Sequence, residues 1–215
     1  MKTKVILLLL LFYFINNTAY SKKIEIIAKV NNDIITNIDL YKEYRLYEFI
    51  SKSKLNLDLQ AKQRFLNSLI NHQIKKSELK KYNINIKRDI IIKRINLILK
   101  SKNSNADQLK NLNLYNFFYD RVETEMKWVE LIRKMFRNRL SINTKEVENK
   151  LSENNDKNFS KQDYNNLIRL EKNKKMAVYN QTYFNEIKLN YLVNCLLYTS
   201  DAADEGLGVD LGGRR

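Results

Sequence analysis

The chain has 215 residues and a formal net charge of +15, with one histidine, one cysteine, four glycines and no proline. So few His and Cys residues exclude a zinc site of the usual kind and a disulfide framework. All four glycines lie in the last ten residues, so the rest of the chain has no glycine-rich phosphate loop and no nucleophile elbow.

The first 21 residues have the three parts of a secretory signal peptide. Two lysines give a positive start, residues 5–15 form an unbroken apolar run, and Ala19 and Ser21 are small residues at the positions that a signal peptidase reads. A membrane anchor is the alternative, but a spanning helix needs about 20 apolar residues, roughly twice this run. The sequence therefore predicts an exported protein that begins near Lys22 and has no membrane span after cleavage.

A small hairpin is predicted at the start of the exported chain. Residues 24–30 are rich in β-branched side chains, residues 31–33 favour a turn, and residues 34–35 resume the strand pattern. Thr36 and Asp39 then have the spacing of a capping box, in which each side chain binds a free backbone N–H at a helix start.

Apolar residues beyond this point recur at steps of three and four, which predicts a series of helices. The clearest pattern runs from Phe118 to Leu140. The fold class is therefore mainly α, with a small β-hairpin near the mature N-terminus, and residues 191–193 are suited to a short strand that returns to this hairpin. The predicted helices cover residues 37–52, 58–82, 87–102, 105–112, 114–139, 143–151 and 163–189.

Two segments differ from the rest in composition. Residues 152–162 are polar and predict a linker between a helical domain of residues 22–151 and a C-terminal helix and strand, residues 163–194, that packs on it. Residues 195–215 resemble a sequencing adapter translated in one frame, so they are left out of the fold prediction. A genuine disordered tail is the alternative.

No catalytic group is predicted. His72 is the only histidine, and a single helical histidine is typical of an ordinary polar surface or core residue. Carboxylates two residues apart, such as Glu123 and Glu125, point to different faces of a helix. The sequence therefore predicts no enzyme activity, no cofactor and no metal. The lysines are scattered rather than gathered in a stripe, and export separates the chain from nucleic acid, so no nucleic-acid partner is expected either.

Aromatic side chains crowd two of the predicted helices. One helix face cannot bury a whole run of consecutive aromatic residues, so part of each group should stay at the surface, where exposed apolar patches mark binding sites. The alternative for each residue is an ordinary place in the core. The candidate binding residues are Tyr41, Tyr44, Tyr47, Leu114, Tyr115, Phe117, Phe118 and Tyr119.

Several segments resemble one known family. Residues 27–40, which include Val30, Asn31, Thr36 and Asp39, are similar to the hairpin and first helix that open SurA-type periplasmic chaperones. Asn83 departs from the pattern, since the family has a glycine there. Further similar segments cover residues 66–81, 82–86, 142–147 and 183–193.

The resemblance implies a helical chaperone core that binds unfolded outer-membrane proteins in the periplasm and works with the outer-membrane assembly machinery. Family members carry parvulin prolyl-isomerase domains before their C-terminal helix, but only residues 152–162 occupy that place here. No catalytic residue is therefore carried over. Two other functions stay open: a non-catalytic envelope protein that supports a fixed partner, and a prolyl isomerase, which would need a domain that this chain lacks.

Overall fold

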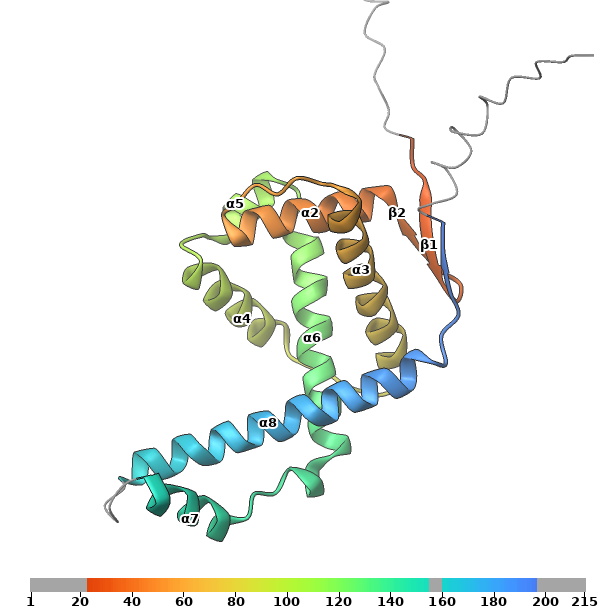
Figure 1. Ribbon diagram of the computed structural model, residues 1–215. Helices are drawn as coiled ribbons and strands as arrows, with labels where there is room; N and C mark the ends of the chain where they lie inside the picture. Colours follow the sequence, from red (N-terminus) through yellow and green to blue (C-terminus); the bar gives the residue numbers. More distant parts are fainter. Residues whose placement is uncertain (1–22, 155–159, 197–215) are drawn as a thin grey trace, which may run out of the picture.

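The computed structural model describes residues 23–154 and 160–196, which form a mainly helical protein with one small antiparallel sheet (Figure 1). The predicted fold class is confirmed. The expected signal peptide and the tail after Leu196 lie outside the described residues. The elements are β1 (Ile26–Val30), β2 (Asp33–Thr36), α2 (Asn37–Ser51), α3 (Leu59–Leu79), α4 (Arg88–Ser101), α5 (Ala106–Asn111), α6 (Tyr115–Met135), the 3-10 helix η1 (Arg137–Leu140), α7 (Thr144–Asn154), α8 (Lys161–Lys188) and β3 (Val193–Cys195).

The sheet brings together the two ends of the described chain, with the strands in the order β2-β1-β3. Asn31 turns the hairpin with a φ of 51°, in the left-handed region that asparagine adopts more readily than most residues. Its backbone N–H donates to the carbonyl oxygen of Leu192 at 2.8 Å, next to the antiparallel pairing of β3 with β1. The returning strand lies two residues later than predicted. It extends through Cys195, the first residue of the segment set apart as an adapter.

Helix starts are predicted more accurately than helix ends. The Thr36–Asp39 capping box is present at the start of α2, with the Asp39 carboxylate accepting from the Thr36 N–H at 2.9 Å. In contrast, α3 ends at Leu79 rather than at residue 82. The long apolar pattern divides into α6, which ends at Met135, and the short η1.

The expected linker is partly helical. Helix α7 continues to Asn154, and α8 already begins at Lys161, after a further capping box between Ser160 and Asp163. Hydrogen bonds from Ser160 hold the pKa of the Asp163 carboxyl below its usual value, as expected for a carboxylate at a helix N-terminus.

Two hydrophobic clusters stabilise the helices. The first lies between the sheet, α3, the C-terminal half of α6 and the end of α8. At its centre Trp128 is fully buried, donates from Nε1 to Asn180 Oδ1 at 2.6 Å, and stacks on Tyr183 with ring centroids 5.6 Å apart. The second cluster joins α2, α4, α5 and the N-terminal half of α6, with Ile95 and Leu109 fully buried.

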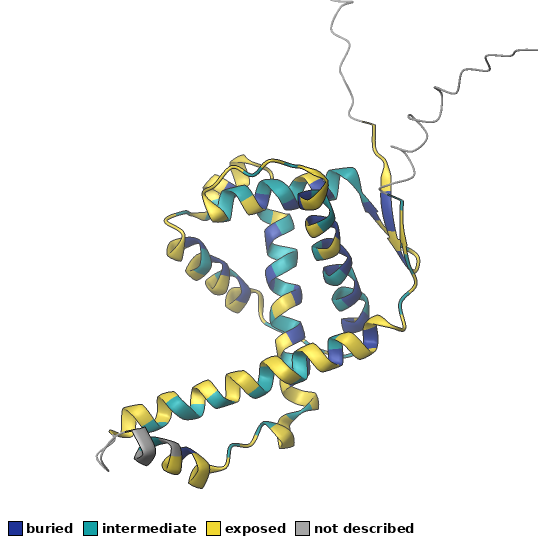
Figure 2. Cartoon of the chain, viewed as in Figure 1, coloured by how far each residue is buried: buried dark blue, intermediate teal, exposed yellow. Residues whose placement is uncertain are grey.

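Helix α8 packs on the core mainly through its C-terminal end. Tyr183 and Ile187, near its C-terminus, are buried in the first cluster. Its N-terminal half is largely exposed, as the yellow ribbon in Figure 2 shows.

A buried carboxylate ties the C-terminal part of the chain to α3. Glu78 accepts hydrogen bonds from the hydroxyls of Tyr183 at 3.1 Å and Tyr191 at 2.8 Å, and from Lys81 Nζ at 2.6 Å. Burial opposes ionisation of Glu78, but the hydrogen bonds from Lys81 and Tyr191 outweigh it and lower the pKa of the carboxyl. Burial also raises the pKa of Tyr191 to about 12.

Candidate functional site

An open groove of about 780 Å³ lies between α4 and α6, and we call it the α4–α6 groove. It has the volume of a small-ligand site, but it is a trough on the surface rather than an enclosed cavity. Its apolar lining comes from the link before α4 and from both helices, and consists of Ile86, Ile90, Ile98, Phe118, Val122, Met126 and Val129.

The spacing of isoleucines gives α4 two apolar faces. Ile91, Ile95 and Leu99 recur at steps of four and point into the second core cluster, where each is almost completely buried. Ile90 and Ile98 lie on an adjacent face that lines the groove, and Ile90 is 48% exposed. A helix needs only one apolar face for its own core, so the second face of α4 is left without a covering element.

Helix α6 supplies the opposite wall. Val122, Met126 and Val129 follow at steps of four and three and so share one side of the helix. Val129 is 38% exposed, whereas Trp128, the residue before it, is fully buried in the first cluster. The same helix therefore contributes to the core on one side and to an uncovered apolar surface on the other.

The rim of the groove is mainly positive. Its charged lining residues are Lys87, Arg94, Arg121, Arg133 and Lys134, against Glu125 and Glu130. Both glutamates are paired, the first with Lys75 at 2.6 Å and the second with Arg133. Within the described part of the chain no carboxylate pairs with Lys87, Arg94 or Lys134. The rim therefore attracts negatively charged groups at long range.

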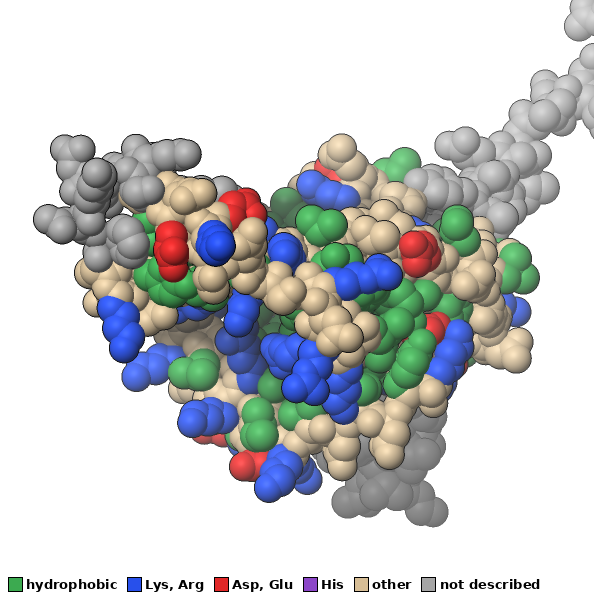
Figure 3. All heavy atoms as spheres, turned by 90° about the horizontal axis from the view of Figure 1, so that it is seen from below, with side chains coloured by type: hydrophobic (Ala, Val, Ile, Leu, Met, Phe, Trp, Pro, Cys, Tyr) green, Lys and Arg blue, Asp and Glu red, His purple; other side chains and the backbone are tan. Residues whose placement is uncertain are grey.

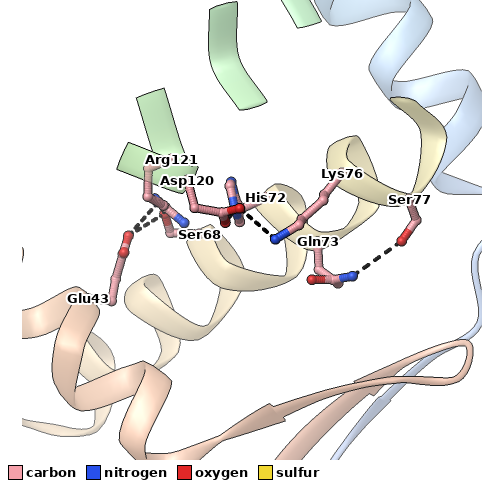
Figure 4. A network of polar contacts seen from close by, with 8 residues as sticks. All are labelled: Glu43, Ser68, His72, Gln73, Lys76, Ser77, Asp120 and Arg121. Carbon is pink, nitrogen blue, oxygen red and sulfur yellow. Dashed lines mark hydrogen bonds and ion pairs between the residues drawn. The ribbon is translucent and has the colours of Figure 1, made fainter. Parts of the chain in front are cut away.

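A buried ion pair fixes α6 against α2 and α3 (Figure 4). Arg121 Nη2 donates to Glu43 Oε1 at 2.6 Å and to Ser68 Oγ at 2.7 Å, and Ser68 in turn donates to Glu43 at 2.8 Å. Arg121 also lines both the α4–α6 groove and a second pocket on its other side. This residue therefore holds the wall between two cavities in place.

A second polar contact links α3 to α6. Lys76 Nζ donates to Asp120 Oδ1 at 2.6 Å, and His72 Nε2 lies 2.9 Å from Asp120 Oδ2, where an ionised carboxylate makes the ring nitrogen the donor (Figure 4). The hydrogen bond from His72, with Lys76 adding to it, lowers the pKa of Asp120 to about 2, although partial burial opposes the shift. His72 is thus a buried structural contact. Across residues 23–154 and 160–196, no group of three or more potential ligands is arranged to hold a metal ion.

The three tyrosines of α2 form a partly exposed group. Tyr41 and Tyr47 are 43% and 42% exposed, while Tyr44 is half-buried and donates to Glu48 Oε1 at 2.6 Å. Tyr47 packs on Phe65, with ring centroids 5.4 Å apart, and both line a pocket of about 490 Å³ between α2 and α3. We call it the α2–α3 pocket.

The other aromatic group contributes mainly to the core. Leu114 and Phe118 are buried in the second cluster, and Tyr115, Phe117 and Tyr119 are half-buried against the clusters. For Leu114 and Phe118 the structure therefore shows the core placement that the sequence left open as the alternative. Phe118 also lines both the α4–α6 groove and the α2–α3 pocket, so it is the one candidate residue that both cavities share.

The predicted binding residues did not include the aliphatic side chains that line the α4–α6 groove. Val129 belongs to the three-and-four apolar repeat of its helix, so the apolar pattern assigns it to the core, whereas Ile90 lies outside the repeat of Ile91, Ile95 and Leu99. One signal was available, since Ile90 begins a run of three isoleucines and one face of a helix cannot bury three consecutive side chains.

The chain matches no protein-family model, and a search of curated proteins finds no match either. None of the helices over residues 23–154 and 160–196 combines the length and the apolar character needed to cross a membrane.

Proposed function

We propose that this protein is an ATP-independent holdase chaperone of the periplasm that binds unfolded outer-membrane proteins, and that it is a SurA-like chaperone core without parvulin domains. The observation that carries the proposal is the α4–α6 groove. It presents a continuous apolar lining on rigid helices, and its exposed members Ile90 and Val129 serve no core of the described chain.

The chemistry of the groove suits the proposed client. Strands of outer-membrane barrels alternate apolar and polar residues, and before assembly their unpaired edges aggregate. A trough with an apolar floor and a charged rim matches such alternation, because apolar side chains meet the floor while polar ones reach the rim. At about 780 Å³ it covers only a few side chains at a time, which favours weak and reversible binding.

The arrangement of the chain ends supports the likeness to SurA. The resemblance implies a C-terminal segment that returns to the first hairpin, and β3 pairs with β1 in this way. Tyr183 and Tyr191 bond to the buried Glu78 and hold the C-terminal segment against α3. Only residues 155–160 separate α7 from α8, which is too short for an inserted isomerase domain.

The proposal is tested by diluting a urea-unfolded outer-membrane porin into buffer with the purified protein and following light scattering. The wild type is compared with Ile90→Ser/Val129→Ser. Its matched control is Leu97→Ser/Val178→Ser, which removes two exposed aliphatic side chains outside the groove. We expect the wild type and the control to suppress aggregation at near-stoichiometric ratios, and the groove variant to need severalfold more protein.

Salt distinguishes an apolar surface from a merely basic one. Suppression by the groove should survive moderate salt, because burial of apolar surface is not screened. Suppression that disappears on adding salt, or that both variants lose equally, would contradict the proposal. Absence of suppression together with co-purification of one fixed partner would instead indicate an envelope protein that supports that partner.

A further inference from the structure

A third cavity, of about 590 Å³, lies between η1 and the N-terminal half of α8, and we call it the η1–α8 cleft. The α8 residues that line it are spaced three or four positions apart, so their side chains lie on one face of the helix. This α8 wall consists of Asn165, Ile168, Arg169, Lys172, Asn173 and Met176.

The opposite wall comes from the end of α6 and from η1. In a 3-10 helix residues three apart lie directly above one another, so Arg137 and Leu140 face the cleft together. Arg133, one helical turn earlier, and Ser141 complete this wall. Arg137, in the 3-10 turn that ends the long apolar pattern, therefore faces α8.

Four basic side chains meet in the cleft, and its described lining contains no carboxylate. Arg133 has a partner in Glu130. Among the described residues, no carboxylate pairs with Arg137, Arg169 or Lys172. Figure 3, which views the molecule from the side of α8, shows Lys and Arg side chains gathered on this face with few acidic ones between them. Uncompensated like charges repel one another, so this arrangement favours a bound anion.

The cleft also has apolar walls. Leu140, Ile168 and Met176 line it and are half-buried. A site for a free inorganic anion gains nothing from such side chains, whereas a charged group that carries a hydrocarbon part gains from both kinds of contact. Guanidinium groups in addition match the geometry of phosphate oxygens.

We propose that the η1–α8 cleft binds the phosphate of an anionic phospholipid. Arg137, Arg169 and Lys172 contact the phosphate oxygens. The three apolar side chains contact the glycerol and the first methylene groups of the acyl chains. This site goes beyond the proposed chaperone function and does not depend on it.

The test is co-sedimentation of the purified protein with two kinds of vesicle, pure phosphatidylcholine and a mixture with phosphatidylglycerol. The variant Arg137→Gln/Arg169→Gln/Lys172→Gln removes three exposed cations of the cleft and leaves Arg133, which the cleft shares with the groove. The matched control Arg64→Gln/Arg88→Gln/Lys93→Gln removes two arginines and one lysine that are exposed elsewhere. All six positions are exposed, so urea unfolding should be unchanged in both variants.

We expect the wild type to bind the phosphatidylglycerol vesicles and not the phosphatidylcholine ones. The cleft variant should bind on the order of a hundredfold more weakly, since each cation near an anionic surface contributes a factor of about five. The control should lose less than about threefold, because charges beyond a Debye length of the membrane are screened.

Three results would overturn the proposal. Equal weakening of both variants would mean that only the overall charge matters. Release from vesicles by inorganic phosphate, at a concentration where chloride of equal ionic strength has no effect, would assign the cleft to the free ion. Binding of a duplex DNA oligonucleotide that the cleft variant loses as strongly as vesicle binding would assign it to nucleic acid.

Discussion

Trp128 and Val129 are neighbours on α6, yet they lie in opposite surroundings. Trp128 is fully buried, stacks on Tyr183 and bonds to Asn180, so α8 and α3 cover that side of the helix. Val129 faces the α4–α6 groove and is 38% exposed. The comparison shows that an apolar position in this chain stabilises the fold only where another element covers it. An uncovered position is available for binding instead.

The largest expected effect concerns the covered side. Trp128→Ala should lower the free energy of unfolding by about 3–5 kcal/mol, the usual result of truncating a buried aromatic side chain. Val129→Ala, one residue along, should change it by less than about 1 kcal/mol because little buried surface is lost. Urea unfolding followed by circular dichroism measures both. Similar losses for the two variants would mean that the groove is closed in solution.

The contrast between these two residues also marks the limit of prediction from the sequence. Local signals are read directly, as the Thr36–Asp39 capping box shows. Burial depends on which elements come to lie alongside. The three-and-four apolar repeat of this helix includes Val129 and leaves out Trp128, although Trp128 is the residue that is buried. The aromatic group is equally ambiguous, since Phe118 is buried while Tyr119, the next residue, is half-buried.

The return of the C-terminal strand to the hairpin was predicted, but side-chain contacts between distant parts of the chain were beyond the sequence. The bond between Tyr191 and Glu78 joins residues 113 positions apart, and no spacing rule links them. The break between α6 and η1 is similar, because the apolar repeat continues to Leu140 while the helix ends at Met135. The η1–α8 cleft depends on that break, so it could not be predicted from the apolar repeat.

Variants of the Arg121–Glu43 ion pair test whether this pair fixes the wall between the α4–α6 groove and the α2–α3 pocket. Arg121→Met should lower the free energy of unfolding by about 2–3 kcal/mol, because it leaves the buried Glu43 carboxylate without its counter-charge. The double variant Glu43→Gln/Arg121→Met should recover part of this loss, since the unpaired charge is then gone as well. Urea unfolding of the two single variants and the double one gives the coupling. Strict additivity would contradict the assignment.

Lowering the pH tests another contact of α6, for which a smaller change in the free energy of unfolding is expected. The pKa of Asp120 is about 2, below its ordinary value of 3.8, so its contacts stabilise the fold fully above about pH 5. That contribution is lost as the pH falls from there through the folded-state pKa. Asp120→Asn should therefore cost about 1 kcal/mol at pH 7, a value discounted for the partial exposure of the side chain. The difference from wild type should disappear near pH 2.

Urea midpoints at pH 7, 4 and 2.5 follow this change. Lys76→Met serves as an internal comparison. It removes one partner of Asp120 and keeps the hydrogen bond with His72, which is the main cause of the shift, so its effect should be smaller. A loss for Asp120→Asn that stays constant over this pH range would mean that packing rather than charge is responsible.

The smallest effect on stability is expected on the uncovered side, where the effect on binding should be clear. Val129→Lys places a charge in the groove at a position that is already 38% exposed, so the free energy of unfolding should change by no more than about 0.5 kcal/mol. The dye 1-anilinonaphthalene-8-sulfonate combines apolar rings with a negative group. It therefore complements the apolar floor and the basic rim of the groove. Its fluorescence with the wild-type protein should fall severalfold in the variant.

Leu97→Lys is the control for this change, because Leu97 is 55% exposed on α4 but does not line the groove. It adds the same positive charge, which by itself attracts the dye. Equal fluorescence losses in the two variants would place the dye elsewhere and remove the support for an open groove. A loss confined to Val129→Lys, with both proteins equally stable, would show that α6 separates stability from binding between two adjacent residues.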